Sequence, residues 1–304
     1  MLIKNHIKIT DVLEGYWKAL LLLLVLVVAL VFLNEYVIAK YIELPMSLAT
    51  ILGTALAFFI GFTNNQAYDR WWEGRKIWGA IVNDSRSWAR QIITYSKASD
   101  TVNQDEVQEF SRQAVHRHIA WLYALKSNLR KSDDKDYRPY LSESEIADLE
   151  AQDNIHNGIL KIQSQKLNDA YEKGVMDGFQ FLAANDLLVR FSDEMGKCER
   201  IKNTVFPTNY HHYTYLFTWF FIVFLTFALT NQIGYWAIPA SWLIGSIYAI
   251  THSIGLTLVN PFEKIKTGNP LDQIVRTIER NLLQMLGEKE LPPPVEAVDG
   301  EYIL

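Results

Sequence analysis

The sequence contains a single cysteine, Cys198, and this scarcity excludes two kinds of stabilisation. One thiol cannot form an internal disulfide, and it cannot build a cysteine-based metal site. We therefore expect Cys198 to be an ordinary packed side chain. Patterns typical of β-strands are nearly absent, and internal repeats are absent. The secondary structure is therefore expected to be almost entirely helical.

The chain also lacks the residue patterns of several functional classes. It has a mild net charge of -5 and no basic block, so we expect no nucleic-acid partner. It contains no Gly-rich phosphate loop, no nucleophile elbow and no HExxH motif, so we expect no enzymatic activity. No small-residue cleavage pattern follows the first apolar run, so we expect no signal peptide.

Long uncharged segments toward both ends of the chain flank a charged middle. A helix of about 20 apolar residues is long enough to cross a bilayer. Four segments approach or exceed that length, at residues 17–37, 44–63, 213–233 and 235–259. A tight turn at residues 231–234 joins the last two into a predicted antiparallel hairpin. The alternative is a set of buried core helices, but the length and lack of charge at 44–63 and 235–259 argue against it.

Basic residues indicate the orientation of these spans. The positive-inside rule assigns the lysine- and arginine-rich flanks of membrane helices to the cytoplasm. The flanks on one side contain Lys4, Lys8, Lys18, Arg70, Arg75, Lys76, Lys197, Arg200, Lys202, Lys264 and Lys266. The loops on the other side contain only Lys40. Both termini and the middle of the chain are therefore predicted to be cytoplasmic.

These spans divide the chain into four predicted parts, at residues 1–64, 65–210, 211–260 and 261–304. The second part is predicted to be a cytosolic helical region. Its expected helices cover residues 69–98, continuing from the second span, then 102–129, 154–162 and 167–203, with a short helix between them capped by Ser142 and Glu145. The fourth part is expected to hold a helix at 271–286 and an extended, proline-rich tail.

The second span combines two stripes of residues, each with the spacing of one helix turn. Gly53, Ala57 and Gly61 recur every fourth residue, and small residues at this spacing let membrane helices approach closely. A second stripe, about 100° away, contains Thr54, Phe58 and Phe62. The first stripe predicts a face that packs against other helices. The second predicts an aromatic face whose role is not helix packing.

Bulky apolar side chains that face a symmetry axis form a hydrophobic constriction, which gates ions by dewetting. The edge of a phenyl ring is positive and favours an anion, whereas its face favours a cation. Phe58 and Phe62 are therefore candidates for the lining of an ion pore. The alternative is that both are ordinary packing or lipid-facing aromatic residues.

Two blocks of sequence, together with the helix before the third span, resemble the bestrophin family. The first block is GFTNNQAYDRWWEGRKIWGAIVNDSR, which contains the run Asp69, Arg70, Trp71 and Trp72. The second is Asn260-Pro261-Phe262, followed by Pro270-Leu271-Asp272. The segment DLLVRFSDEMGKCER at residues 186–200 is similar to the cytoplasmic helix that precedes the third span in that family. The order of elements agrees over essentially the whole chain.

The resemblance implies a homopentameric ion channel with one pore on the fivefold axis, a narrow neck in the membrane and a wider cytosolic vestibule. Counting back from Trp71 places the neck at Thr54, Phe58 and Phe62. Thr54 departs from the bulky apolar residue usual there, so a neck of two rings is expected. Phe58 resembles animal members more than bacterial ones.

The resemblance also implies features on the cytosolic side of the neck. Polar contacts at the inner mouth are expected from Asn64, Asn65 and Gln66. A second constriction at the cytosolic exit corresponds most nearly to Leu187 or Leu188. The alternative for these two residues is that they are core leucines.

Animal bestrophins have a run of acidic residues after their Asn-Pro-Phe motif, and this run forms a calcium clasp. Here residues 263–269 read EKIKTGN, and two lysines oppose a calcium ion electrostatically. Calcium sites usually include several carboxylates. We therefore expect no calcium clasp, no calcium activation and no cofactor.

Together these observations predict an all-α membrane protein with four transmembrane helices and a large cytosolic helical region around a fivefold pore. We expect a multi-pass homopentamer in the bacterial inner membrane, in contact with lipid, that conducts small monovalent anions such as chloride. The preference for anions rests on two aromatic rings and the lack of an acidic ring. The alternatives are a monovalent cation channel for sodium or potassium and a membrane-anchored scaffold or signalling protein. A secondary transporter is disfavoured because the spans show no inverted repeat.

Overall fold

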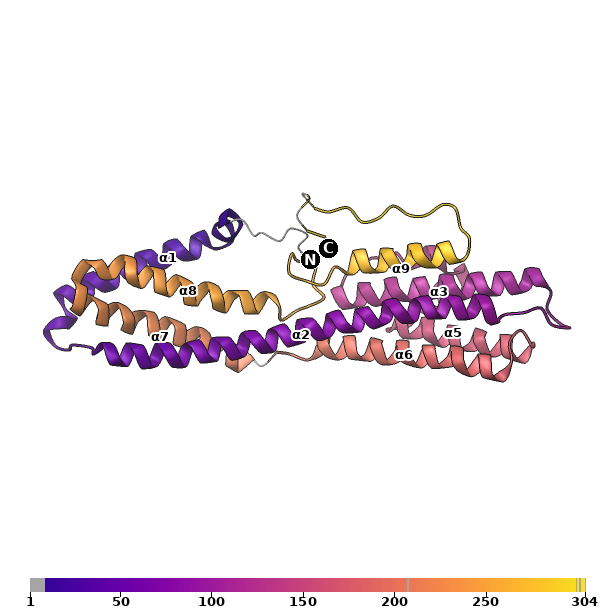
Figure 1. Cartoon of the computed structure of the whole chain (residues 1–304), viewed down its shortest axis with the longest axis horizontal. Coiled ribbons are helices and arrows are strands. Elements are labelled where there is room, and N and C mark those ends of the chain that lie inside the picture. The colour runs from indigo at the N-terminus through magenta and orange to yellow at the C-terminus, as the bar shows by residue number, and fades with distance from the viewer. Residues whose placement is uncertain (1–8, 207, 299, 301, 304) are drawn as a thin grey trace. The chain divides into compact units, whose positions relative to one another are not determined.

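The computed structural model describes residues 9–206, 208–298, 300 and 302–303, and the side chains of these except residues 9–14 and 208–211. The described chain is built from helices (Figure 1), and its one β pairing is an isolated bridge between Val298 and Tyr302. The all-α prediction is confirmed. The α-helices are α1 (Ile9–Tyr36), α2 (Met46–Tyr95), α3 (Gln104–Arg130), α4 (Glu143–Glu150), α5 (Ile155–Glu172), α6 (Gly178–Asn203), α7 (Thr208–Ile233), α8 (Ala237–Thr257) and α9 (Leu271–Met285), and the 3₁₀ helices are η1 (Ile38–Lys40), η2 (Arg138–Tyr140) and η3 (Gly234–Trp236).

The chain forms two compact units. The membrane unit consists of the described residues up to Trp71 together with Val205–Val259. The extramembrane unit consists of Trp72–Thr204 and the described residues from Asn260 onward. Helix α2 contributes its first part to the membrane unit and its second part to the extramembrane unit.

The membrane unit contains helices that are long and apolar enough to cross a bilayer. They lie within the segments Gly15–Lys40, Met46–Tyr95 and His212–Thr257, and the last segment includes both α7 and α8. The protein is therefore a membrane protein with the four predicted spans. One detail differs: α7 continues through Ile233, and the turn is the 3₁₀ helix η3. Gly234 has φ of +57° there, a conformation that glycine adopts without steric cost.

Helices α1, α7 and α8 pack against one another in the membrane unit (Figure 1). Polar groups join the helices at several levels. The Asn34 amide donates to Asn231 Oδ1 at 2.7 Å, Trp242 Nε1 donates to the Leu20 carbonyl at 3.0 Å, and Tyr248 Oη donates to the Gly53 carbonyl at 3.1 Å. Such bonds fix the register of helices whose remaining contacts are apolar.

The extramembrane unit has its core around α3, which packs against α5, α6 and α9. Trp88 of α2, Trp121 of α3 and Phe191 of α6 are fully buried and form an aromatic cluster. His118 lies within this cluster, and its Nε2 is 2.8 Å from the hydroxyl of Ser85. Burial lowers the pKa of His118 to about 3, so the imidazole is neutral and serves as a core residue.

Helix caps explain where several of these helices begin. Ser142 and Glu145 form the predicted capping box at the start of α4. The predicted boundary between residues 162 and 167 is wrong, because α5 continues to Glu172. Gly174, with φ of +72°, ends that helix, and Asp177 forms a capping box with Gln180 that begins α6.

The tail after α9 has no helix among its described residues, as the run of prolines predicts. It lies against its own unit at two described points. The Arg280 guanidinium donates to the Pro292 carbonyl, and the ammonium of Lys266 lies 5.2 Å from the centre of the Tyr302 ring.

Replacing Gly255 with alanine is expected to destabilise the membrane unit. A Cβ atom there would lie 2.0 Å from Asn64 Oδ1 and 3.3 Å from Asn64 Cα, so α2 and α8 would have to separate. Overpacking of this kind costs about 1–3 kcal/mol. Thermal unfolding of the purified protein in detergent measures the loss. Gly196→Ala is the matched control, because no heavy atom lies within 4 Å of its Cβ, and equal melting temperatures for the two variants would contradict the close packing.

Candidate functional site

Helix α2 has one face buried in the membrane unit and one face that its own chain leaves open. The buried positions recur every three or four residues and are Ala49, Gly53, Leu56, Ile60, Thr63 and Ala67. The opposite positions are exposed at the same spacing, and we call them the outward face: Thr54, Phe58, Phe62, Asn65 and Asp69. This outward face is the candidate functional site.

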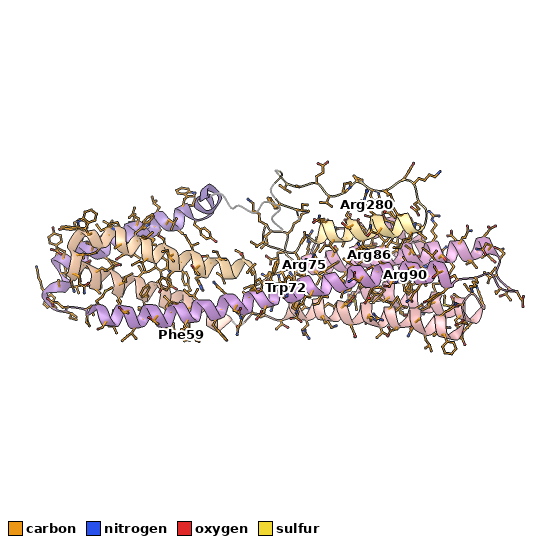
Figure 2. The ribbon with its side chains drawn as sticks, viewed as in Figure 1. Phe59, Trp72, Arg75, Arg86, Arg90 and Arg280 are labelled. Atoms are coloured by element: carbon orange, nitrogen blue, oxygen red, sulfur yellow. The ribbon has the colours of Figure 1, made fainter. Side chains whose placement is uncertain are left out.

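The three residues predicted to form the neck all lie on the outward face. Phe58 is 72% exposed and Phe62 is 47% exposed, although both are large apolar side chains. The Phe58 ring contacts Phe59 edge to face, with ring centres 6.2 Å apart, and Figure 2 shows Phe59 on α2. The Thr54 hydroxyl donates to the Thr50 carbonyl at 2.9 Å, so its polar group is satisfied by its own helix. The assignment of these residues to a pore stays a prediction.

The small-residue stripe behaves differently from the expectation. Gly53 is a packing position, because a Cβ there would lie 2.8 Å from the Phe221 ring. Ala57 and Gly61 are exposed, and no heavy atom lies within 4 Å of a Cβ at Gly61. Within one chain the stripe as a whole is therefore not a packing face. The residues of α2 that pack against α1, α7 and α8 include the larger Leu56 and Ile60.

The three polar residues predicted at the inner mouth point in different directions. Asn64 faces α8, where its amide donates to the Thr251 carbonyl at 2.9 Å and its carbonyl oxygen lies against Gly255. Its placement at a mouth stays a prediction, and in the single chain its side chain joins two helices. Asn65 is exposed on the outward face, and Gln66 is half-buried beside it.

The second family motif has a structural role in the extramembrane unit, whereas Asp69, Arg70 and Trp71 of the first motif belong to the membrane unit. Phe262 is buried against Gly74 of α2, where a Cβ would lie 3.1 Å from the ring. The loop after it is closed by a bond from the Asn269 amide to the Pro261 carbonyl at 2.8 Å, and another joins the Glu263 amide to the Asn260 carbonyl. In the first motif, Arg70 and Trp71 are half-buried, while Asp69 and Trp72 are exposed (Trp72 is labelled in Figure 2).

Leu187 and Leu188 are only 2% and 5% exposed and belong to the core of the extramembrane unit. Their side chains pack against that core, so neither is available to line an aperture. The alternative, that both are core leucines, holds. Exposed large apolar residues of the same helix are Phe179, Leu182 and Val189.

Asp272, just after the second motif, is surrounded by cations. Its carboxylate lies 2.7 Å from Arg130, 3.1 Å from Lys126 and 3.3 Å from Lys264. These partners hold the pKa of Asp272 well below its usual range despite its partial burial. Lys264, one of the two lysines expected to oppose calcium, is thus an ion-pair partner of this carboxylate.

Glu194 of α6 is a buried carboxyl that the sequence did not indicate. It is 5% exposed, and its Oε2 has no hydrogen-bond partner in the described part of the chain. Burial and the nearby negative charge of Asp84 raise its pKa to about 8. Lys197 and Arg190 oppose this shift, and Asp193 adds to it.

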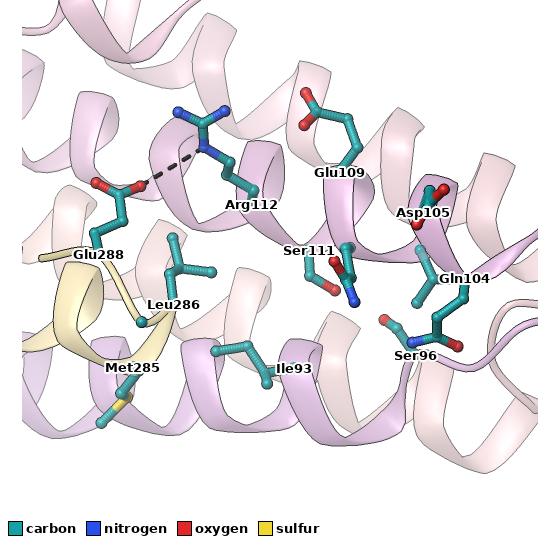
Figure 3. A pocket seen from close by; sticks show the side chains of 13 residues that line it. Ile93, Ser96, Gln104, Asp105, Glu109, Ser111, Arg112, Met285, Leu286 and Glu288 are labelled. Atoms are coloured by element: carbon teal, nitrogen blue, oxygen red, sulfur yellow. Dashed lines mark ion pairs between the residues drawn. The ribbon is translucent and has the colours of Figure 1, made fainter.

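A cavity of about 650 Å³ lies among the last turns of α2, the start of α3 and the end of α9 (Figure 3). Its lining includes an ion pair between Arg112 and Glu288, with Nε and Oε1 3.6 Å apart. Throughout the described residues, no group of three or more His, Cys, Asp or Glu side chains is placed to hold a metal ion. All residues that line the cavity belong to the extramembrane unit, and none of them is part of the outward face.

The fold and the outward face define a multi-span helical membrane protein whose long second helix presents aromatic residues to the outside of its own chain. The protein belongs to the bestrophin family, because the family described as "Bacterial/Fungal Bestrophin protein" matches residues 7–284. The resemblance seen in the sequence is thereby confirmed.

Similar proteins are known from several bacteria. The chain is 30% identical over 286 residues to the voltage-dependent anion channel-forming protein YneE of Escherichia coli K12, covering 94% of this chain and 91% of that protein. It is 28% identical to the voltage-dependent anion channel-forming protein RSc3414 of Ralstonia nicotianae, over 93% of this chain and 91% of that protein. A crystal structure of a bacterial bestrophin homologue from Klebsiella pneumoniae matches with a TM-score of 0.82 and 26% identity, over 89% of this chain and 98% of that one.

Glu194 is expected to make stability depend on pH. In the folded protein its carboxyl titrates near 8, and in the unfolded chain near 4.5, so the folded state binds the proton more tightly. Its contribution to the free energy of unfolding is therefore present below about pH 4.5 and declines as the pH rises toward 8. Thermal unfolding between pH 5 and 9 should show a smaller decline for Glu194→Gln than for the parent protein. Asp133→Asn, at an exposed carboxylate that does not contribute to the shift of Glu194, is the control, and an unchanged slope in Glu194→Gln would contradict the assignment.

Proposed function

We propose that the protein is a homopentameric channel for small monovalent anions such as chloride in the bacterial inner membrane. In this proposal both termini and the extramembrane unit are cytoplasmic, and the outward face of α2 lines the pore. The observation that supports it most directly is the exposure of Phe58 and Phe62, one helix turn apart, on the face of α2 opposite its buried positions. The names of the relatives from Escherichia coli and Ralstonia, both anion channel-forming proteins, supply the ion class.

The outward face supports assembly around an axis. One chain contributes one lining helix, so a closed pore needs several copies related by rotation. Ala57 and Gly61 flank the phenylalanines and are open in the single chain, so they let neighbouring copies of α2 approach closely. Five copies are the number that the family resemblance implies.

In this arrangement the neck has two hydrophobic rings. Phe58 and Phe62 are separated by one helix turn, and Thr54 follows one turn further with its hydroxyl bonded to its own helix. Phenyl rings that present their edges to the axis stabilise an anion without a fixed charge. The neck therefore excludes bulk water while it tolerates a chloride ion.

We also propose that calcium does not regulate the channel and that no cofactor is needed. The support is the surroundings of Asp272, where Arg130, Lys126 and Lys264 already neutralise the carboxylate. A calcium ion there would have to displace three cations and find further oxygen ligands.

Phe58→Ala is expected to widen the neck and to increase single-channel conductance, because the larger ring is replaced by a methyl group. Planar bilayer recording of the purified protein under a potassium chloride gradient measures conductance and reversal potential together. Phe220→Ala, at an exposed phenylalanine of α7, is the matched control and should leave conductance unchanged.

The same recordings test the proposed function. A reversal potential near that of chloride supports the anion channel, and one near that of potassium would establish a cation channel instead. No current from the correctly folded protein would favour a membrane-anchored scaffold. Conductance unchanged by Phe58→Ala would remove Phe58 from the pore.

Calcium titration is a separate measurement. Conductance of the purified channel is expected to stay constant from calcium-free buffer with chelator to about 1 mM calcium, the weak end of the range of protein calcium sites. Magnesium at the same concentrations controls for screening of surface charge. A change produced by calcium alone would show that a calcium site exists.

A further inference from the structure

We propose that Asp69 forms a ring of negative charge at the inner mouth of the pore and that this ring reduces the anion current. The inference rests on the proposed function, in which the outward face of α2 lines the pore of a homopentamer. It identifies a determinant of ion selectivity below the aromatic neck, in a residue that belongs both to a family motif and to the outward face.

The position of Asp69 on α2 is the first support. Successive residues of an α-helix are turned by about 100°, so Asp69 points within about 20° of Phe58, closer than Phe62 does. Asn65 lies between them on the same face, and both polar residues are exposed. The rise along the helix from Phe62 to Asp69 is about 10 Å. A helix that turns Phe58 to the axis therefore turns Asp69 to the axis as well.

The charge of Asp69 has little compensation in the membrane unit. Its Oδ2 accepts a hydrogen bond of 3.5 Å from the neutral amide Nδ2 of Asn65. The adjacent Arg70 points about 100° away around the helix. An aspartate side chain in contact with water is negatively charged at neutral pH. Each subunit would thus present one carboxylate to the mouth.

The charges that follow Asp69 along α2 do not cancel it. Glu73 is also acidic, and its Oε1 is bonded to Arg200 at 2.7 Å. Arg75 and Lys76 come six and seven residues after Asp69, so each lies at least about 9 Å further along the helix. That separation exceeds the screening length of about 8 Å at physiological ionic strength.

Five carboxylates around one axis repel anions and attract cations, and the low-dielectric walls of a membrane pore focus this field. The expected preference for anions was based partly on the lack of an acidic ring in the neck, and the proposed ring lies below the neck, at the mouth. The edges of Phe58 and Phe62 would then favour anions within the neck while Asp69 lowers their concentration at its cytosolic end. Anions leaving the cytosol are therefore hindered more than anions arriving from the other side.

The test measures the permeability ratio of chloride to potassium from reversal potentials in planar bilayers at about 0.1 M salt, where the screening length is about 10 Å. Asp69→Asn should raise this ratio by roughly threefold or more, since one kT of potential changes a local ion concentration by that factor. Asp69→Glu should retain the parent ratio. In about 1 M salt, where the screening length is about 3 Å, the effect of Asp69→Asn should largely disappear.

Asp133→Asn is the matched control, because it removes one exposed carboxylate per chain from a loop of the extramembrane unit that is not part of α2. A second design does not depend on the asparagine variant folding. Cys198 is the one native cysteine and is fully buried, so Asp69→Cys can be modified selectively after assembly. A negatively charged thiol reagent should restore the parent ratio, and a positively charged reagent should raise the chloride preference further.

The outcomes separate the two proposals. If the parent protein conducts but both Asp69→Asn and the two modified forms of Asp69→Cys keep its permeability ratio, the acidic ring is overturned and the channel stands. An equal change in Asp133→Asn would also overturn it, because net charge alone would then explain the shift. If the folded parent protein conducts no ions, the proposed function fails and the acidic ring fails with it.

Discussion

The structure depends on the division of helix α2 into a buried face and an outward face. The buried face is maintained over the whole helix, from Ala49 and Ile60 to Trp78, Trp88 and Ile92. No proline interrupts these fifty residues, so the helix has no built-in kink. Side chains near both ends are held in packed cores, and the orientation of the outward face follows from that packing. The placement of Phe58, Phe62 and Asp69 is thus a consequence of burial elsewhere on the same helix.

Much of the fold could be predicted from the sequence because it depends on length and local pattern. The four spans follow from uncharged length, and the start of α4 follows from the Ser142 and Glu145 capping box. The boundary between α5 and α6 was missed, although its signals were present. Gly174 and the pair Asp177 and Gln180 mark a helix end and a helix start, and apolar periodicity outweighed them.

The candidate site was predicted less completely, because exposure depends on which neighbouring helix a residue meets. The spacing of Phe58 and Phe62 was sufficient to place them on one face. The same reasoning did not foresee the contact of Asn64 with α8, where Gly255, nearly 200 positions later, leaves room for its side chain. It also could not decide whether Leu187 lines an aperture or lies in a core, because a leucine at a helix surface and one in a core have the same sequence pattern. Asp69 was recognised as part of a motif, but its direction was not considered.

The uninterrupted helix limits how such a pore could change its width. Turning α2 about its axis far enough to move Phe58 aside would also bring the fully buried Trp78 and Trp88 toward solvent, at a large cost in hydrophobic free energy. A change in the χ angles of the phenyl rings involves no such loss, since their side chains are exposed within the single chain. In the proposed channel, the width of the neck is therefore expected to change through rotation of the phenyl rings about their χ angles, while α2 keeps its orientation.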